Sequence, residues 1–365
     1  METTKSSVIT THSNSSGKEL LRYYEFSKKM NKLNSALRIL DDYKFPLNKK
    51  AVKEVSNYYE NNLINSKNDK KYTKEYINDF KTLSSKLDYK YGTTSEMNSY
   101  NRVHILRSLA CKSLNIRGED LNRLTSMFKD KNTLTLNYDK LSVRLLAYYS
   151  KDKKLNELLE RCDEYAEDFY SHLATIIFND KYENCTDVRF YNYYGKDEKS
   201  SKSVCLSNNE GKDRKKIARQ VILYEIYGAV PDAHYKESFL NYVDIFENYF
   251  CELKCWVDKM LKYDKPYIQD VFGNVFVFEN SYITNRTPHS NICALINLTE
   301  SSIHKLFLLE LLTCDWINVR LPLQNCFIVD FNREDELSHY SISYKIFSKF
   351  DELFKKYNLK LDIQK

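Results

Sequence analysis

Basic side chains at helical spacing are the residues of this sequence whose types and positions could do chemistry. Lys140 and Arg144 are four residues apart, and a second basic segment extends from Lys212 to Arg219. Because an α-helix turns about every 3.6 residues, each set would lie along one side of a helix. Two such helices facing each other would form a cationic groove, which recognises phosphate through charge-assisted hydrogen bonds. An ordinary solvated helix surface is the alternative for each residue taken alone.

Other arrangements that could do chemistry are less specific. Cys251 and Cys255 would share a helix face, but a zinc site needs two more ligands, and His234 is the only histidine near them in the sequence. Carboxylates crowd 157–168, where interspersed basic residues are typical of a solvated helix surface. The sequence contains no Walker phosphate loop, no dinucleotide-binding fingerprint and no His-Glu-x-x-His motif. We therefore expect a protein that is not an enzyme, with no catalytic residue, no metal ion and no cofactor.

The composition indicates a globular, mainly helical protein. Hydrophobic residues make up 42% and charged residues 29% of the 365, a balance that is too apolar for a disordered chain. Only 7 Gly and 5 Pro are present, so few tight turns are expected and long helices are favoured. No run approaches ~18 consecutive apolar residues, and we expect no helix that crosses a membrane.

Charge and cysteine content bear on partners and location. The net charge of +6 is mild, so it leaves nucleic acid open as a partner without indicating it. The 9 cysteines are an odd number spread along the chain, which is more typical of reduced thiols than of a disulfide framework. Residues 1–17 are rich in Ser and Thr and lack the apolar core of a secretory signal, so they are predicted to be a disordered tail. We expect a cytoplasmic or nuclear protein.

Apolar residues at helical spacing predict a succession of helices. Gly273-Asn274 between two apolar runs predicts a hairpin within 267–283, and the apolar run Cys326–Val329 predicts a short strand. A stretch rich in Ser, Lys, Asn and Gly at 181–213 predicts an exposed, mobile insertion. The expected helices cover 18–45, 48–65, 71–88, 96–114, 118–130, 138–151, 153–178, 213–229, 232–262, 288–313 and 336–357.

Six segments along the chain resemble the helices of 14-3-3 proteins. Gly118–Asp130 is similar to the signature of the third helix, with an acidic pair at its start and an aromatic residue followed by Lys129. Tyr100–Val103 resembles the opening of the second helix. Ser142–Leu146 is similar to the later part of the third helix, after a short insertion, and Tyr235–Phe239 is similar to part of the sixth. The remaining two matches, to the seventh and ninth helices, are Thr287–Thr299 and Leu353–Leu361.

The resemblance implies an all-α antiparallel helical array, shaped as a cup of nine helices. The 14-3-3-like domain would cover 95–362, with 18–94 as an N-terminal helical extension and with insertions at 181–213 and 267–283. The implied function is that of an adaptor or scaffold that binds phosphoserine or phosphothreonine peptides of phosphorylated proteins, as a homodimer. The first helices could instead be read at 19–63, where Glu60 would replace the phosphate-binding lysine.

The resemblance also assigns roles within the groove. Basic residues would donate to the phosphate, two asparagines would hydrogen-bond the main chain of the peptide, and an isoleucine would line the apolar wall. With the basic residues indicated by spacing alone, the expected phosphopeptide-binding residues are Lys129, Lys140, Arg144, Lys212, Arg219, Ile296, Asn297 and Asn358.

A second interpretation is an RNA-binding helical-repeat protein. The helix pairs at 100–128 and 138–165 resemble each other loosely, and their faces are rich in Tyr, Asn and basic residues. Repeats of this kind read bases with polar side chains and stack them on aromatic ones. Three or more copies are needed for a stable stack, and the sequence offers only two.

Overall fold

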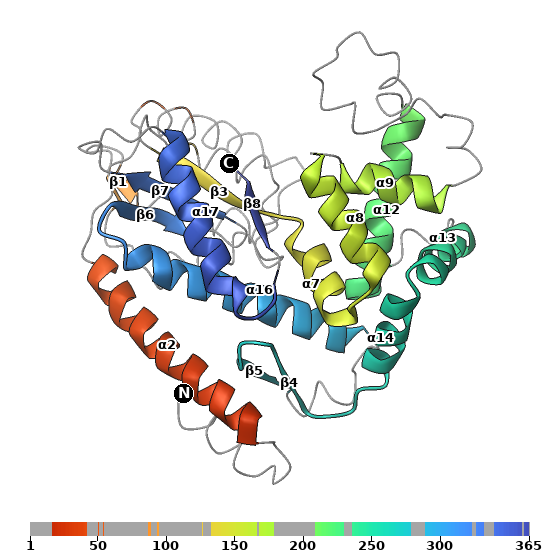
Figure 1. Ribbon diagram of the computed structural model, residues 1–365, viewed down its shortest axis with the longest axis horizontal. Coiled ribbons are helices and arrows are strands. Elements are labelled where there is room, and N and C mark those ends of the chain that lie inside the picture. The colour runs from red at the N-terminus through yellow and green to blue at the C-terminus, as the bar shows by residue number, and fades with distance from the viewer. Residues whose placement is uncertain are drawn as a thin grey trace, which may run out of the picture. The chain divides into compact units, whose positions relative to one another are not determined.

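The computed structural model describes residues 17–41, 50, 54, 87–88, 93–94, 126, 133–165, 168–178, 209–229, 236–278, 289–322, 326–331, 339–359 and 361–364. The chain divides into two compact units. The first comprises Met1–Asp139 and Ser301–Lys365, and the second comprises Lys140–Glu300. Figure 1 labels the helices and strands of both.

A four-stranded antiparallel sheet with the order β6-β7-β3-β8 lies at the centre of the first unit. Its central strand β3 (Thr133–Asp139) alternates between Leu and polar residues, the period expected of a half-buried strand. Leu136 of β3 lies opposite Phe327 of β7. The other strands are β6 (Ile317–Pro322), β7 (Cys326–Phe331) and β8 (Asp362–Gln364).

Helices α16 (Ser290–Leu312) and α17 (His339–Lys355) pack on this sheet through aromatic side chains. The ring of Phe307 lies edge-on to Phe327, at 5.4 Å, and to Phe350, at 4.7 Å. His304 stacks on Phe327 at 4.2 Å. These geometries are the favoured ones for aromatic pairs, so the sheet and the two helices share one core. Helix α2 (Gly17–Asp41) also belongs to this unit and buries Phe26.

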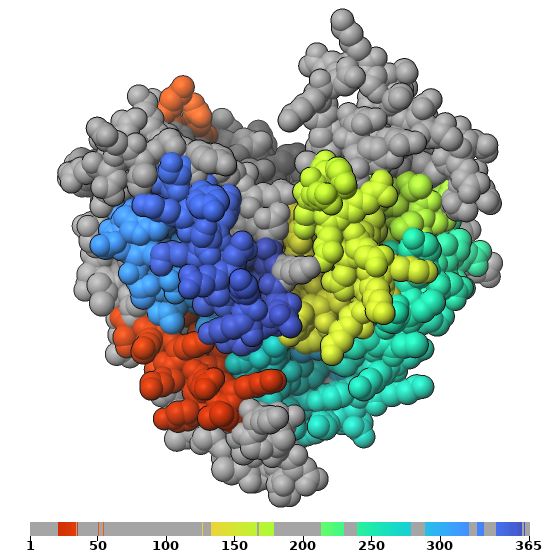
Figure 2. Space-filling view, viewed as in Figure 1, coloured from red at the N-terminus to blue at the C-terminus, as the bar shows by residue number. Residues whose placement is uncertain are grey.

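The second unit is built mainly from helices around buried aromatic residues, among them Phe169, Phe246 and Phe250. A two-stranded hairpin, β4 (Tyr267–Gln269) and β5 (Val275–Val277), comes after the described helices of this unit that are named next. The helices that precede it are α7 (Leu141–Ser150), α8 (Lys153–Glu164), α9 (Phe169–Ile177), α12 (Asn209–Tyr227), α13 (Lys236–Tyr249) and α14 (Cys251–Leu261). The yellow-green surface of α8 and α9 is continuous with the teal surface of α13 and α14 in Figure 2.

Capping residues divide segments that the periodicity predicted as single helices. Asp168 accepts a hydrogen bond from the backbone N–H of Ser171 and starts α9, so the helix expected at 153–178 is two helices. The helix expected at 232–262 is also divided, at the buried Phe250, where no side chain makes a capping hydrogen bond.

The prediction of an all-α fold is wrong, because the described residues contain the four-stranded sheet. The nine-helix cup of a 14-3-3 protein is therefore not the architecture of this chain. The helix expected from residue 138 starts at Leu141, because Tyr138 and Asp139 complete strand β3. The predicted hairpin and the strand at 326–329 are confirmed as β4–β5 and β7.

Several predictions fall outside the described residues. They include the tail at 1–16, most of the insertion at 181–213, most of the expected extension up to residue 94, and the third-helix signature apart from Ser126. Helix α16 alone among the described helices is long and apolar enough to cross a bilayer, and 56% of its most apolar window is buried inside the protein. A buried core helix has the same properties.

Candidate functional site

The exposed face of helix α12 carries an ordered series of side chains. Lys216, Arg219, Leu223 and Tyr227 follow one another at intervals of three or four residues, and all four are exposed. We call this series the α12 stripe. Leu223 and Tyr227 are 39% and 38% exposed, so both offer apolar surface to the solvent. With a rise of 1.5 Å per residue, the stripe is roughly 17 Å long, from cations at one end to an aromatic ring at the other.

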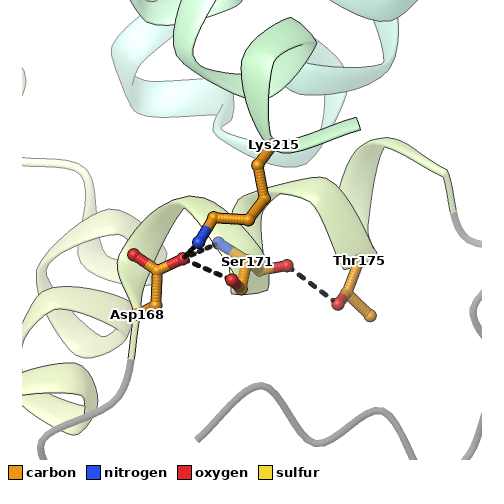
Figure 3. Close-up of polar contacts among 4 residues, drawn as sticks. All are labelled: Asp168, Ser171, Thr175 and Lys215. Atoms are coloured by element: carbon orange, nitrogen blue, oxygen red, sulfur yellow. Dashed lines mark hydrogen bonds and ion pairs between the residues drawn. The ribbon is translucent and has the colours of Figure 1, made fainter. Parts of the chain in front are cut away.

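The neighbouring cations of the same helix are used within the protein. Arg214 is buried, and its guanidinium lies over the ring of Phe178 at 5.4 Å. Lys215 pairs with Asp168 at 2.6 Å (Figure 3). This aspartate also accepts from the Ser171 backbone N–H, so Lys215 is tied to the start of α9.

The cations of the stripe differ from these neighbours. No carboxylate among the described residues pairs with Lys216 or Arg219, and both lie on the solvent side of α12. An exposed, unneutralised lysine and arginine one turn apart can bind an anion through charge-assisted hydrogen bonds. The arginine can grip a phosphate with two parallel N–H donors.

A polar cluster lies at the other end of the stripe. The Tyr227 hydroxyl donates to Asn297 Oδ1 at 3.4 Å, and the Asn297 amide donates to Cys293 Sγ at 3.2 Å. Burial, with smaller contributions from the nearby Glu300 and Cys293, raises the pKa of Tyr227 to about 12. The hydroxyl therefore stays protonated and remains a donor at neutral pH.

Glu300 and Ser142 also belong to this polar cluster. The Ser142 hydroxyl donates to Glu300 Oε1 at 2.5 Å. Burial raises the pKa of the Glu300 carboxyl, and the hydrogen bond from Ser142 opposes that rise. Three elements, α7, α12 and α16, thus bring hydroxyl, amide and carboxyl groups together beside Tyr227. Such groups can hydrogen-bond the hydroxyls or ring atoms of a polar organic ligand.

The residues predicted from the sequence are dispersed. Arg219 and Asn297 come close to this site, and Lys212 lies on α12, whereas Lys129 is outside the described residues. Arg144 does not face a groove, because both terminal guanidinium nitrogens donate to the Asp163 carboxylate at 2.9 and 2.7 Å. The other positions are Lys140 at the start of α7, Ile296 in the core, and Asn358 in the first unit, exposed and with a φ of 56°.

Reasoning from sequence missed Leu223, Tyr227, Ser142 and Glu300. The first two continue the basic segment at helical spacing, so the signal was present in the period of α12. Ser142 and Glu300 are 158 residues apart, and nothing local in the sequence indicates their hydrogen bond.

Comparisons with known proteins identify the fold. No protein-family model matches the sequence, and no curated protein matches it. Among solved structures, the chain is similar to the POL domain of Pol1 from M. smegmatis, which was solved in complex with a DNA primer-template and dNTP. The TM-score is 0.55 at 10% sequence identity, over 91% of this chain and 68% of that one. At this identity, the similarity shows a shared fold.

This finding corrects the interpretation drawn from the sequence. The 14-3-3 resemblance is wrong. The two predicted functions, a phosphopeptide-binding adaptor and an RNA-binding helical-repeat protein, are wrong as well. The expectation that the chain is not an enzyme is contradicted as well, because the solved domain that shares its fold belongs to a polymerase. This chain therefore shares its fold with that POL domain.

Proposed function

We propose that this chain is a polymerase-like protein that binds a nucleoside triphosphate along the α12 stripe. The observation that carries the proposal is the order of the exposed side chains, from Lys216 and Arg219 to Leu223 and Tyr227. The similar POL domain was solved with dNTP and primer-template DNA, which supports this class of ligand.

The chemistry of the stripe complements that of a nucleotide. The phosphates would lie against Arg219 and Lys216, where charge-assisted hydrogen bonds are strong. The base or sugar would lie against Leu223 and Tyr227, because an exposed aromatic ring and an aliphatic side chain offer a flat apolar contact. The sugar hydroxyls would then be near Asn297 and the other groups of the polar cluster.

The described carboxylates do not fit the pair of divalent ions that polymerases use for nucleotidyl transfer. No three His, Cys, Asp or Glu side chains come together within the described ranges. On the sheet, Asp139 and Asp330 lie towards opposite ends of β3, because Asp330 lies opposite Thr133. Six residues of strand separate these positions by roughly 20 Å. Asp330 also accepts from Arg320 Nε at 2.8 Å. We therefore derive no transfer step from these residues.

Titration of a fluorescent nucleoside triphosphate against the purified chain tests the proposal. The double variant Lys216→Ala/Arg219→Ala should lose affinity by about 100-fold or more, since charged hydrogen bonds contribute about 1.5–3 kcal/mol each and about 1.4 kcal/mol is a tenfold change. The matched control is Lys153→Ala, an exposed lysine on α8, which should bind as the wild type does.

Two results would contradict the nucleotide site. One is wild-type affinity in the double variant. The other is equal binding of the nucleoside without phosphates, because the cations would then have no role. Primer extension with the same samples, in the presence of Mg²⁺, measures separately whether the bound nucleotide is transferred to DNA.

A further inference from the structure

Glu225 is a buried carboxyl group on the inner face of the helix that carries the stripe. Its side chain is 0% exposed, and neither carboxyl oxygen has a hydrogen-bond partner among the described residues. It lies on the buried side of α12 with Val221 and Ile222, opposite Leu223 and the rest of the stripe. Burying an unpaired carboxylate costs free energy, so the neutral form of the group is favoured at this position.

The charged groups around Glu225 come from the two helices that follow α12. Glu247 of α13 and Asp258 of α14 are like charges, and Lys254 of α14 is the one cation that favours the ionised form. Lys254 is already paired with Glu247 at 2.9 Å. An ionised Glu225 would therefore compete with Glu247 for the same ammonium group.

These surroundings determine the protonation of Glu225. Burial, followed by the charge of Glu247, raises its pKa to about 8. Other groups at this interface keep one state from pH 7 to 9. Burial lowers the pKa of His289, which stays neutral, and burial together with Glu225 raises the pKa of Tyr224. Asp244 of α13 adds a further negative charge near Tyr224.

We propose that Glu225 makes nucleotide binding pH-dependent: its neutral carboxyl keeps α12 packed on α9 and α13, and its ionisation displaces the helix. This inference rests on the proposed function. An ionised carboxylate must reach water or an unpaired cation, and from a fully buried position it does so only if α12 moves. Because the stripe occupies the opposite face of the same helix, that movement misplaces Arg219 and Tyr227 together.

Nucleotide affinity measured across pH tests the inference. If only the form with neutral Glu225 binds, the apparent affinity follows the neutral fraction, which falls about tenfold between pH 7 and pH 9. Glu225→Gln keeps the shape of the side chain and cannot ionise, so its affinity should change less than twofold over this range. The matched control is Glu252→Gln on α14, an exposed carboxylate, which should retain the pH dependence of the wild type.

A second readout separates failure of this inference from failure of the proposed function. Trp256 lies on α14 between Lys254 and Asp258, and it becomes the only tryptophan after Trp316→Phe. Without nucleotide, its emission should change with a midpoint near pH 8 in this background, and Glu225→Gln should abolish the change.

The outcomes are distinct. An equal loss of affinity at high pH in Glu225→Gln, or no loss in the wild type, overturns the inference. If no nucleotide binds at any pH, the proposed function fails. In that case a Trp256 transition that depends on Glu225 still supports the pH-driven displacement of α12, and the absence of a transition overturns it as well.

Discussion

Asp152 connects two helices of the second unit, and its replacement should destabilise that unit strongly. One carboxylate oxygen accepts from the backbone N–H of Leu155 at 2.9 Å and so caps α8. The other accepts from the backbone N–H of Leu253 at 3.1 Å, at the start of α14. The side chain is 0% exposed, so water cannot replace either hydrogen bond.

The size of the effect follows from these two contacts. Asp152→Ala removes a helix cap, which costs about 1 kcal/mol, and leaves the buried N–H of Leu253 unpaired, which costs about 1–3 kcal/mol more. We expect a loss of about 3 kcal/mol in the free energy of unfolding. Asp152→Asn keeps one acceptor oxygen but turns an amide donor towards the other N–H, so it should lose about half as much.

The assay is urea unfolding followed by the emission of Trp256 in the Trp316→Phe background. Trp256 lies one turn beyond Leu253 on α14, so it reports on the unit that contains the mutation. Glu157→Ala, an exposed residue on α8, is the matched control and should stay within about 0.5 kcal/mol of the wild type.

The relative free energies of unfolding of the wild type and the two Asp152 variants test this argument. The wild type should be most stable, followed by Asn and then Ala at position 152. If Asp152→Ala unfolds within about 0.5 kcal/mol of the control, the carboxylate does not connect α8 with α14, and the argument from burial is refuted.

Two further predictions follow from the same unit. Glu225→Gln should raise the free energy of unfolding as the pH increases. The folded-state pKa of about 8 lies above the ordinary value of 4.5, so the wild type loses stability between these pH values, up to a ceiling of about 5 kcal/mol. Urea unfolding at pH 5 and pH 8 should therefore show a larger difference between variant and wild type at pH 8, and a constant difference would contradict the assignment. Gly228→Ala should lower the melting temperature measured by calorimetry, since φ is +65° there and a Cβ would lie 2.8 Å from the His289 ring; an unchanged value would contradict that backbone conformation.

Local patterns predicted the helices better than the sheet. The helix at 213–229, the hairpin after residue 267 and the strand at Cys326 all have signals within a few residues of themselves. Strand β3 also alternates at period two, but its partners on β7 and β8 are far along the chain. Lys140, with φ of 48°, marks the junction between this strand and α7, and the periodicity placed the start of the helix two residues before it, at residue 138.

The 14-3-3 resemblance failed for a physical reason. Its matches are short amphipathic patterns, such as the start of α16 and the end of α17, and such patterns occur in helices of many folds. The pattern reports which face of a helix is buried, but not what covers it. Arg144 illustrates the difference, since its spacing from Lys140 indicated a groove and the structure pairs it with Asp163.

The candidate site could be predicted only in part. The basic half of the α12 stripe could be predicted from the spacing of its residues in the sequence, because all of them lie on one helix. The polar cluster was not visible, because Ser142, Tyr227 and Glu300 come from three separate helices. A site that depends on tertiary contacts leaves no period in the sequence, and it is found only when the fold is known.

Helix α12 combines two properties that each carry a cost. Its outer face exposes Leu223 and Tyr227, which gains nothing for folding, and its inner face buries Glu225 without a hydrogen-bond partner among the described residues. Local rules of stability are most often broken at functional sites. We expect the position of α12 to matter for function, because the stripe and Glu225 lie on opposite faces of this one helix. If the Glu225→Gln variant is more stable at pH 8 and its nucleotide affinity no longer changes with pH, the buried carboxyl and the exposed stripe are coupled through α12.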